Sequence, residues 1–426
     1  MILSKTILEN PDAVAEQLNH YEETVSPAIF EAYIAVLRTQ IANEVSFKFH
    51  ENGKKGAIDA ATGVGKSYFA IKECIDLVSK RPQAKILLVV PTEELRDNNW
   101  KDEFEKWGAI DIYNNNLKRV CYASLHKIRN EQFDFIIEDE YHHITTANAI
   151  FFKHNIYEGI MCLSATKPKS LEKLRLLEAI GIKTIVHIPL ATAVKLKLVS
   201  PYSILVVETR LDNFNRNIEA GGKEKKFMVT EKQNYDYKDK KLQKMLYSKK
   251  DKEGRKKYEY AIRERMRLVY NMSSKKEIAR YLLDNFIPES EKYLIFAGSI
   301  EHANELCKYK FHSKNKRYNA KHLQLFNDDI TNRLACVEAL NEGVNIRKVK
   351  GALALQVNSV DRDLVQRLGR LIRYVRGHKG KFIILCCIDT QDKEWTETAL
   401  ESFDESTITR TSYSQILVGN FKYDDF

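Results

Sequence analysis

Short apolar runs alternate with longer polar stretches along most of the chain. In the first half, four such runs lie at residues 56–60, 85–90, 133–138 and 160–165. Runs of this length, separated by segments long enough for a helix, are typical of parallel strands joined by crossover helices. We therefore expect the first half of the chain to form an α/β domain with a parallel sheet.

A second series of apolar runs has the same character and predicts a second α/β domain. Its members lie at residues 202–208, 293–298, 351–356 and 382–388. The stretch 188–201 between the two series is interpreted as a hinge. The predicted domains are residues 1–195, with a short helical lead-in over residues 1–30, and residues 196–426.

The segment of about 210–285, at the start of the second domain, is expected to be helical and basic. Its part 221–260 holds 14 Lys or Arg and 7 Asp or Glu residues. It is either a solvated helical hairpin with a flexible tip or a surface that grips a phosphate backbone. Interleaved tyrosines would suit stacking on bases, although tyrosine is also common on helix faces.

The composition narrows the class of protein. Of 426 residues, 44% are hydrophobic and 30% are charged, which is ordinary for a soluble globular protein and excludes disorder throughout. No run approaches the ~20 apolar residues that cross a bilayer, and no signal peptide is apparent. Seven cysteines without a CxxC pair indicate neither a disulfide framework nor a zinc site. A cytoplasmic protein without a membrane partner is expected.

The net charge of +10, with a pI near 9.0, suits a polyanionic partner, because phosphates attract a basic surface. Many basic proteins bind no nucleic acid, so the charge alone does not decide the function.

A glycine-rich segment between the first strand and a helix predicts a phosphate-binding loop. It runs through Ala60, Ala61, Thr62, Gly63, Val64, Gly65, Lys66 and Ser67. Glycines let backbone N–H groups face phosphates, and the following helix adds its positive end. Lys66 would reach the β- and γ-phosphates of ATP, and Ser67 would ligate Mg²⁺. Ala60 stands where the usual pattern has glycine.

The apolar run at 133–138 ends in a pair of carboxylates, where a P-loop enzyme places its second metal ligand. Asp139 would hold Mg²⁺, and Glu140 would polarise the attacking water as general base. His142 would sense the γ-phosphate or contact the next motif.

Together these two motifs resemble the superfamily 2 DEAD/DEAH-box (DExH) helicases, with Asp139, Glu140, Tyr141 and His142 as the DExH box. Further segments resemble other motifs of that family in the expected order. The resemblance implies that Arg38 and Gln40 form the adenine-reading element, that Pro91 and Thr92 touch nucleic acid, and that Ser164, Ala165 and Thr166 couple hydrolysis to domain movement.

In the second domain the resemblance implies nucleic-acid contacts for Ser299 and Asn341 and a nucleotide contact for Gly343. Gln366, Arg370 and Arg373 belong to a segment that resembles the last helicase motif. In a helix these three side chains share a face. The guanidinium groups of Arg370 and Arg373 would neutralise the γ-phosphate from the second domain, so hydrolysis would require closure.

The resemblance covers about residues 35–400 and implies two tandem RecA-like domains with ATP and Mg²⁺ as cofactors. The doubled histidine and compact length look like UvsW-type and XPB-type DNA helicases and restriction-type translocase motors. In such relatives a helical stretch often opens the second domain. The predicted function is an ATP-dependent helicase or translocase on DNA, in a phage- or bacterium-like intracellular, nucleoid-associated setting.

Several alternatives stay open. The enzyme could unwind RNA, or it could be a clamp that ATP switches without unwinding. No strand-separating β-hairpin is evident in the sequence. Trp395 resembles an element of such motors, but packing is favoured. The acidic–aromatic end, residues 421–426, is a loose or packed tail, or a peptide for a protein partner. A monomer is expected.

Overall fold

The computed structural model describes residues 7–426 with internal gaps. These gaps are residues 169, 222–225, 247–250, 338–345, 347–348, 358–363, 365–366, 370 and 372–374. The described chain forms two compact units: unit 1 holds residues up to Pro201 together with 375–378, and unit 2 holds the rest.

Unit 1 is built on a six-stranded sheet in which every described pairing is parallel. In sheet order its strands are β3 (Leu117–Cys121), β2 (Ile86–Val90), β4 (Gln132–Asp139), β5 (Ile156–Ser164), β1 (Lys55–Ala60) and β6 (Thr184–Ile188). The central strands are buried on both faces, which explains their unbroken apolar sequence.

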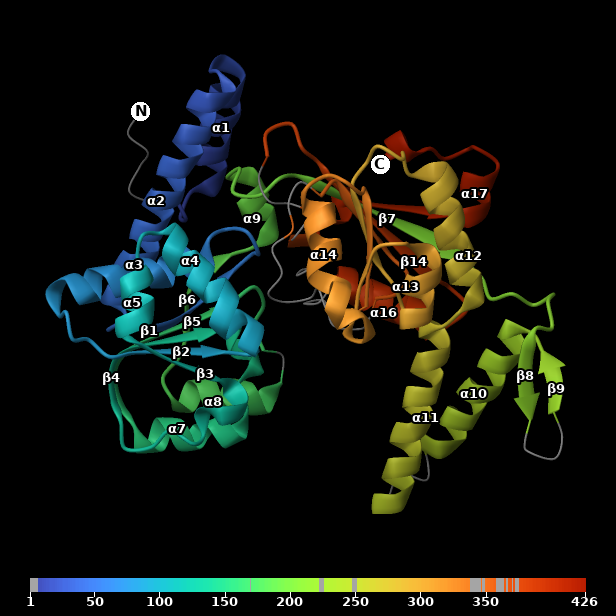
Figure 1. Cartoon of the computed structure of the whole chain (residues 1–426), viewed down its shortest axis with the longest axis horizontal. Coiled ribbons are helices and arrows are strands. Elements are labelled where there is room, and N and C mark those ends of the chain that lie inside the picture. The colour runs from blue at the N-terminus through green and yellow to red at the C-terminus, as the bar shows by residue number, and fades with distance from the viewer. Residues whose placement is uncertain are drawn as a thin grey trace. The chain divides into compact units, whose positions relative to one another are not determined.

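Helices cover both faces of this sheet. Figure 1 shows α3, α4 and α5 on one side and α7 and α8 on the other. The helices of the unit are α1 (Pro11–Thr24), α2 (Pro27–Glu51), α3 (Lys66–Lys80), α4 (Trp100–Lys106), α5 (Ile110–Asn115), α6 (Tyr122–Leu125), α7 (Ala149–His154), α8 (Leu171–Ala179) and α9 (Leu190–Lys195). A π-helical turn, Leu95–Asn99, runs into α4.

The stretch 188–201, interpreted from the sequence as a hinge, is instead packed into unit 1. It contains α9, and Leu196 and Leu198 are fully buried. The reason is its apolar side chains, which a free linker would leave in water.

Unit 2 has a seven-stranded sheet, again with parallel pairing throughout. In sheet order its strands are β11 (Lys310–Phe311), β12 (Arg333–Cys336), β10 (Tyr293–Phe296), β13 (Gly351–Ala354), β14 (Gly380–Cys387), β7 (Tyr202–Thr209) and β15 (Ile408–Ser412). The α/β class with two parallel sheets is therefore confirmed.

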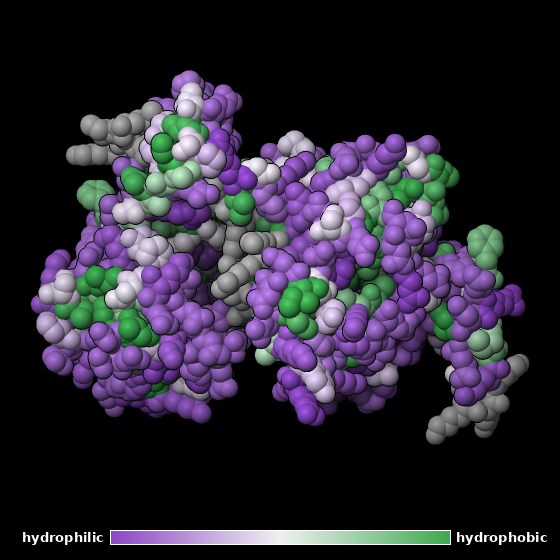
Figure 2. Space-filling view, turned by 45° about the horizontal axis from the view of Figure 1, so that its top comes forward, coloured by the Kyte–Doolittle hydropathy of each residue, from purple (hydrophilic) through white to green (hydrophobic). Residues whose placement is uncertain are grey.

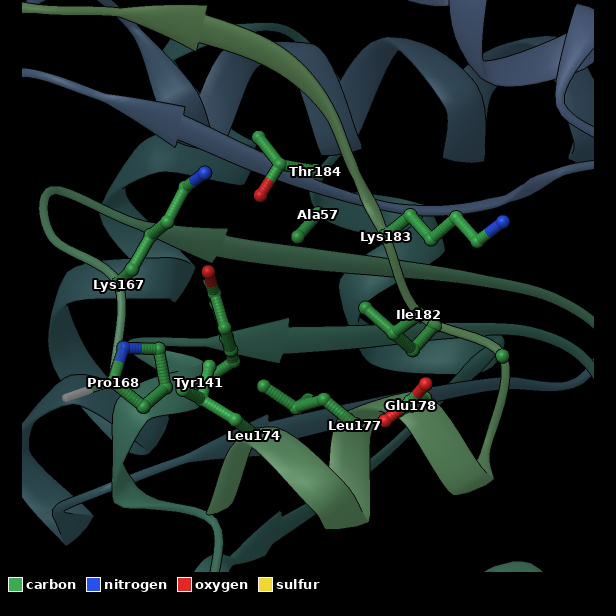
Figure 3. Close-up of a pocket in the computed structure, with 11 residues that line it drawn as sticks. Ala57, Tyr141, Lys167, Pro168, Leu174, Leu177, Glu178, Ile182, Lys183 and Thr184 are labelled. Carbon is green, nitrogen blue, oxygen red and sulfur yellow. The ribbon is translucent and has the colours of Figure 1, made fainter. Parts of the chain in front are cut away.

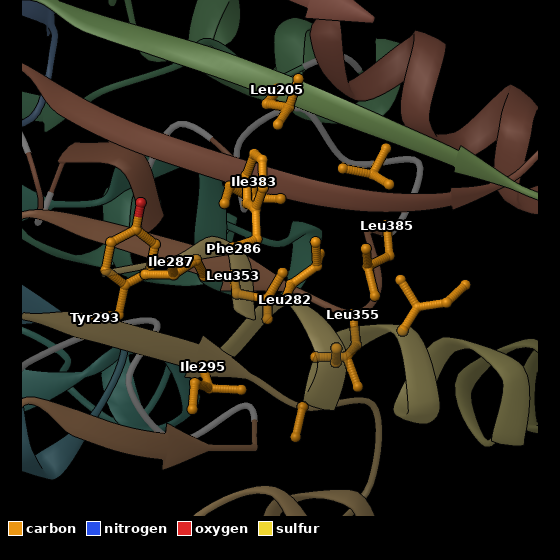
Figure 4. Packing of buried hydrophobic residues seen from close by; sticks show 14 of the residues in the cluster. Leu205, Leu282, Phe286, Ile287, Tyr293, Ile295, Leu353, Leu355, Ile383 and Leu385 are labelled. Carbon is orange, nitrogen blue, oxygen red and sulfur yellow. The ribbon is translucent and has the colours of Figure 1, made fainter. Parts of the chain in front are cut away.

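The helices of unit 2 are α10 (Glu231–Leu246), α11 (Lys252–Tyr270), α12 (Ser273–Tyr281), α13 (Ile300–Leu306), α14 (Lys316–Asn327), α16 (Gln391–Leu400) and α17 (Tyr413–Leu417). One apolar core of the unit packs α12 and its following π-turn, Leu282–Phe286, against the sheet. Figure 4 shows Leu282 and Phe286 facing Leu353, Leu355 and Ile383 in this core.

The C-terminal tip belongs to the same core. Tyr423 and Phe426 are 8% and 7% exposed, and the Tyr423 hydroxyl lies 2.9 Å from that of Tyr293. Of the two alternatives for this end, the structure has the packed tail, because its aromatic side chains are buried.

The segment 210–271 leaves the carboxyl end of β7 and forms what we call the basic arm. It contains an antiparallel hairpin, β8 (Ile218–Gly221) and β9 (Lys226–Val229), followed by α10 and α11. Figure 1 shows α10 and α11 side by side, extending away from the sheet of their own unit. The hairpin was missed in the sequence because its strands are short and mostly exposed.

Buried polar contacts fix the root of this arm to unit 2. Glu231 is 2% exposed and accepts a hydrogen bond from the Ser274 hydroxyl at 2.6 Å. Just after the arm, in α12, the buried Lys275 ammonium pairs with the buried Asp392 carboxylate and donates to the Leu355 carbonyl oxygen at 2.9 Å. Removing such a network would leave charges buried without partners.

The described surface is mainly polar. Hydrophilic side chains dominate the face in Figure 2, with apolar side chains gathered in small separate patches. Among the described residues, no helix combines the length and apolarity needed to cross a bilayer.

Candidate active site

The loop between β1 and α3 forms a cradle at the carboxyl edge of the first sheet. Gly63 and Gly65 have φ angles of +89° and +112°, a conformation that side-chain-bearing residues rarely adopt. The loop then enters the N-terminus of α3. Free backbone N–H groups and the helix dipole favour an anion at such a position.

The side chains of the loop differ in exposure. Val64 is buried at 3% exposure, so a ligand in the cradle would meet its backbone only. Thr62 and Ser67 are half-buried, at the start of the loop and in the first turn of α3. The sequence predicts phosphate and metal contacts for these two residues.

Lys66 is turned back onto its own loop. Its ammonium group donates a hydrogen bond to the Ala60 carbonyl oxygen at 2.9 Å. Burial lowers the pKa of Lys66, while the charges of Glu140, Asp139 and Asp59 act in the opposite direction. The lysine thus lies among carboxylates at the end of β1, within reach of the cradle.

Arg38 of α2 holds the outside of the loop. Its guanidinium donates to the carbonyl oxygens of Gly63 and Val64 at 3.1 and 3.0 Å and to that of Leu198. Burial lowers the pKa of this arginine. Two residues further along the helix, the amide oxygen of Gln40 is buried and accepts no hydrogen bond from the described residues. An unsatisfied buried acceptor of this kind indicates a missing donor.

Asp139 ends β4 and receives a hydrogen bond on each carboxylate oxygen. The Trp100 indole N–H donates to Oδ2 at 2.8 Å, and the Glu140 amide donates to Oδ1 at 3.1 Å. Burial, followed by the charge of Glu140, raises the pKa of Asp139, against the opposing effects of Trp100 and Lys66. A cation beside this carboxylate would keep it ionised.

Glu140 has a strained backbone and a charged side chain. Its φ of +50° and ψ of +52° lie in the left-handed region, which is rare for a residue with a long side chain and is frequent at functional sites. Burial acts to raise the pKa of Glu140, but hydrogen bonding to His142 and the charge of Lys66 outweigh it. The resulting lowered pKa keeps the carboxylate ionised.

Ser164 joins the end of β5 to this glutamate. Its hydroxyl lies 3.1 Å from Glu140 Oε2, 2.9 Å from His142 Nδ1 and 2.9 Å from the Thr166 carbonyl oxygen. Ala165 is half-buried between the two polar residues of the segment. The residues predicted for hydrolysis and for coupling thus form one connected cluster.

Sequence reasoning missed Asp59, which is buried on β1. Its carboxylate accepts from the Tyr141 hydroxyl at 2.6 Å and the Thr184 hydroxyl at 2.7 Å, and Lys167 lies 3.8 Å away. Figure 3 shows the polar ends of Tyr141, Thr184 and Lys167 converging at one wall of a neighbouring pocket. The one signal in the sequence was an acidic residue inside an otherwise apolar strand.

The residues predicted to touch nucleic acid lie at carboxyl edges of strands. Pro91 and Thr92 directly follow β2, where Thr92 is exposed and its hydroxyl accepts from the Leu95 amide at 3.3 Å. In unit 2, Ser299 follows β10, but its hydroxyl caps α13 by accepting from the His302 amide at 3.2 Å.

The remaining predicted site residues lie outside the described part of the chain. They are Asn341, Gly343, Gln366, Arg370 and Arg373. Among their described neighbours, Arg367 is 5% exposed, donates to the Gln356 carbonyl oxygen at 3.1 Å and lies over the Phe296 ring.

The amino-acid sequence is similar to that of known proteins. Residues 31–169 match the family model described as type III restriction enzyme, res subunit. A relative, the DNA 3'-5' translocase XPB2 of Sulfurisphaera tokodaii, is 24% identical over 355 residues, which cover 75% of each chain.

Two solved structures share the fold at low identity. The type ISP restriction-modification enzyme LlaBIII bound to DNA has a TM-score of 0.55 and 16% identity over 88% of this chain, which spans only 31% of that enzyme. S. cerevisiae Dbp5 bound to RNA and ADP BeF3 has a TM-score of 0.53 and 11% identity, covering 93% of this chain and 96% of Dbp5.

These likenesses to solved structures show the fold, with its tandem RecA-like arrangement. The family match and the XPB2 relative support a superfamily 2 helicase that uses and hydrolyses ATP.

Proposed function

We propose that this chain is an ATP-driven helicase or translocase of superfamily 2 that acts on DNA. The observation that carries the proposal is the environment of Glu140. A strained backbone aims an ionised carboxylate, held by Ser164 and His142, at the sheet edge that also carries the P-loop. A general base in that position would accept the proton of a water that attacks the γ-phosphate.

The residues present fit a Mg²⁺ ion. Asp139 and Ser67 offer the hard oxygen ligands that Mg²⁺ prefers, and burial of Asp139 favours a cation beside it. When bound with ATP, the ion would neutralise charge on the β- and γ-phosphates. Lys66 would leave the Ala60 carbonyl oxygen for a phosphate oxygen, and the amides of Gly63 to Gly65 would bind the phosphates.

The base of the nucleotide would meet α2. The unpaired Gln40 amide oxygen fits the exocyclic amine of adenine, which guanine lacks at that position. Arg38 would act by positioning, because its hydrogen bonds go to the carbonyl oxygens of the loop.

For the second half of the site we keep the roles predicted from the sequence. Arg370, Arg373 and Gln366 would complete the γ-phosphate site from the second RecA-like domain, with Gly343 beside the nucleotide. Asn341 and Ser299 would touch the nucleic-acid backbone, together with Pro91 and Thr92 of unit 1.

The basic arm supports a nucleic-acid partner. Seven of its cations are exposed and have no ion pair with any residue that the structure describes: Arg216, Lys240, Lys244, Lys252, Arg255, Lys256 and Arg267. Unpaired surface cations bind phosphates by releasing counterions. We favour DNA because XPB2 is named a DNA translocase and LlaBIII is bound to DNA.

The test is ATP turnover with a panel of single-stranded, duplex, forked and four-way DNA and matching RNA. Wild-type protein should be stimulated by DNA. Glu140→Gln should keep nucleotide binding and lose about 10²- to 10⁴-fold in turnover, the usual contribution of a general base. Glu131→Gln, which alters a surface pair with Lys118, is the matched control and should behave as wild type.

Ordinary turnover by Glu140→Gln would contradict the assigned base, and stimulation by RNA alone would reassign the substrate. A second candidate is a clamp that ATP switches. Displacement of a third strand from a DNA triplex reports translocation, and strand separation on forks reports unwinding. DNA-stimulated turnover with neither activity would favour the clamp.

A further inference from the structure

Trp100 contacts Asp139, the proposed metal ligand. It is the first residue of α4, a helix for which no role in hydrolysis has been proposed above. The side chain is 2% exposed, and its indole N–H lies 2.8 Å from Asp139 Oδ2. A buried indole N–H needs an acceptor, but a backbone carbonyl would serve equally well. Here the acceptor is the carboxylate at the centre of the site.

This hydrogen bond restricts how Asp139 can turn. Trp100 holds Oδ2, and the Glu140 amide holds Oδ1 at 3.1 Å, so the carboxylate plane is fixed at both oxygens. Each oxygen keeps a lone pair for a cation. Hydrogen bonds from outside the ligand set orient metal ligands in this way and are often worth 10- to 100-fold in metal affinity.

The backbone before Trp100 leads directly to the predicted nucleic-acid contact. The π-helical turn Leu95–Asn99 ends where Trp100 begins α4. At its start, the Leu95 amide donates to the Thr92 hydroxyl, and the Arg96 amide donates to the Thr92 carbonyl oxygen at 3.1 Å. The Tyr113 hydroxyl also donates to the Arg96 carbonyl oxygen at 2.7 Å.

One short hydrogen-bonded segment therefore joins exposed Thr92 to buried Asp139. π-Helical turns are rare and occur frequently at functional sites, because their looser winding can change register. A contact on Thr92 would shift the start of this turn, and the indole at its end would carry the shift to the carboxylate.

We propose that Trp100 is a positioning residue that links nucleic-acid contact at Thr92 to the orientation of the Asp139 carboxylate. The inference rests on the proposed function. It adds a physical route by which polynucleotide stimulates hydrolysis within unit 1 alone.

The first test removes the N–H group and keeps the ring. In Trp100→Phe, the Mg²⁺ concentration for half-maximal turnover should rise on the order of 10- to 100-fold, and the ratio of DNA-stimulated to unstimulated turnover should fall toward one. Trp107→Phe is the matched control, because Trp107 lies in the same region but stacks on Tyr68 at the surface. In this control, the Mg²⁺ concentration for half-maximal turnover and the ratio of DNA-stimulated to unstimulated turnover should equal those of wild type.

The second test uses binding alone and leaves Trp100 intact, so it also stands if Trp100→Phe fails to fold. The chain has three tryptophans, and Trp107→Phe/Trp395→Phe leaves Trp100 as the reporter. Its emission should change when Mg²⁺ is titrated with a non-hydrolysable ATP analogue, and single-stranded DNA should shift the midpoint of that titration.

Unchanged emission with Mg²⁺ and DNA, or a wild-type stimulation ratio in folded Trp100→Phe, would overturn the inference. Failure of the proposed function gives a different result, because wild-type turnover would then not respond to any nucleic acid.

Discussion

In unit 1 the charged groups at the carboxyl edge of the sheet surround the cradle, whereas in unit 2 two of them, one just after the basic arm in sequence, pair with each other in the interior. Lys66 is held by one hydrogen bond to the Ala60 carbonyl oxygen, which a ligand can replace, and Glu140 is held by Ser164 and His142. Lys275 and Asp392 instead satisfy each other in the interior, at 1% and 0% exposure.

The difference shows that buried charged side chains can serve two different functions in parallel sheets of the same kind. Where the charges stay next to a loop, they can serve chemistry. Where they pair with one another, they join two elements of the interior, here α12 and α16. Three sets of substitutions test how differently the two units use their charged side chains.

The largest effect is expected from Lys275→Met. It would leave Asp392 buried without its cation, and breaking a buried ion pair typically costs about 3–5 kcal/mol. The free energy of unfolding of unit 2 should fall by that order, followed by far-UV circular dichroism in denaturant. Nucleotide binding by unit 1 should persist.

Lys276→Met is the matched control. Lys276 pairs with Glu305 at the surface, and surface pairs contribute only about 0–1 kcal/mol. Equal losses from the two substitutions would mean that burial does not make the Lys275 pair more important to stability than a surface pair.

A smaller effect is expected for a buried carboxylate of unit 1 that has no cation. Burial raises the pKa of Glu138 to about 7, although the Cys162 thiol donates to it. The folded state then keeps a proton that the unfolded state loses, so stability falls as pH rises from about 4.5 to about 7. At about 1.4 kcal/mol per pKa unit, the total is about 3 kcal/mol.

Glu138→Gln removes this titration. The variant should be more stable than wild type at pH 8, and the gap should close toward pH 4.5, as measured by denaturant unfolding without Mg²⁺. A gap that does not vary with pH would show that Glu138 does not titrate in this window.

The smallest effect concerns the exposed cations of the arm. Replacing Lys252, Arg255 and Lys256 with alanine should reduce the salt dependence of DNA binding, with a loss in slope of about 0.7–0.9 for each phosphate contact removed. Turnover without DNA should not change. Fluorescence anisotropy of labelled DNA at several salt concentrations measures the slope.

Three lysines of unit 1, Lys80, Lys153 and Lys183, give a control with the same change in charge. They are exposed and lie at the amino edge of the sheet, away from the cradle. If both triple variants lose the same slope, net charge rather than the arm explains the binding.

The sequence was sufficient to predict the strands that are buried on both faces of a sheet. The runs that became β1, β2, β4 and β5 are mainly apolar because helices cover both sides of the sheet. The edge strands were not foreseen. β3 and β15 contain polar residues such as Lys118 and Arg410, since an edge strand faces water and needs no apolar run.

The local part of the candidate site was also readable, because the P-loop and the carboxylates after β4 are contiguous in sequence. Contacts between distant residues were not. Trp100 lies 39 residues from Asp139, and Tyr141 lies 82 residues from Asp59. The sequence around Trp100 or Tyr141 does not identify its hydrogen-bond partner. Such pairs depend on the order of the strands in the sheet, which the spacing of apolar residues along the chain does not reveal.

The pairing of β7 has a consequence for synthesis on the ribosome. This apolar strand is complete at Thr209, yet its neighbours β14 and β15 begin only at Gly380 and Ile408. At roughly 5–20 residues per second, translation takes on the order of ten to thirty seconds to supply them. The first sheet can assemble during that interval, while β7 waits with both edges unpaired, a state that invites aggregation or chaperone capture.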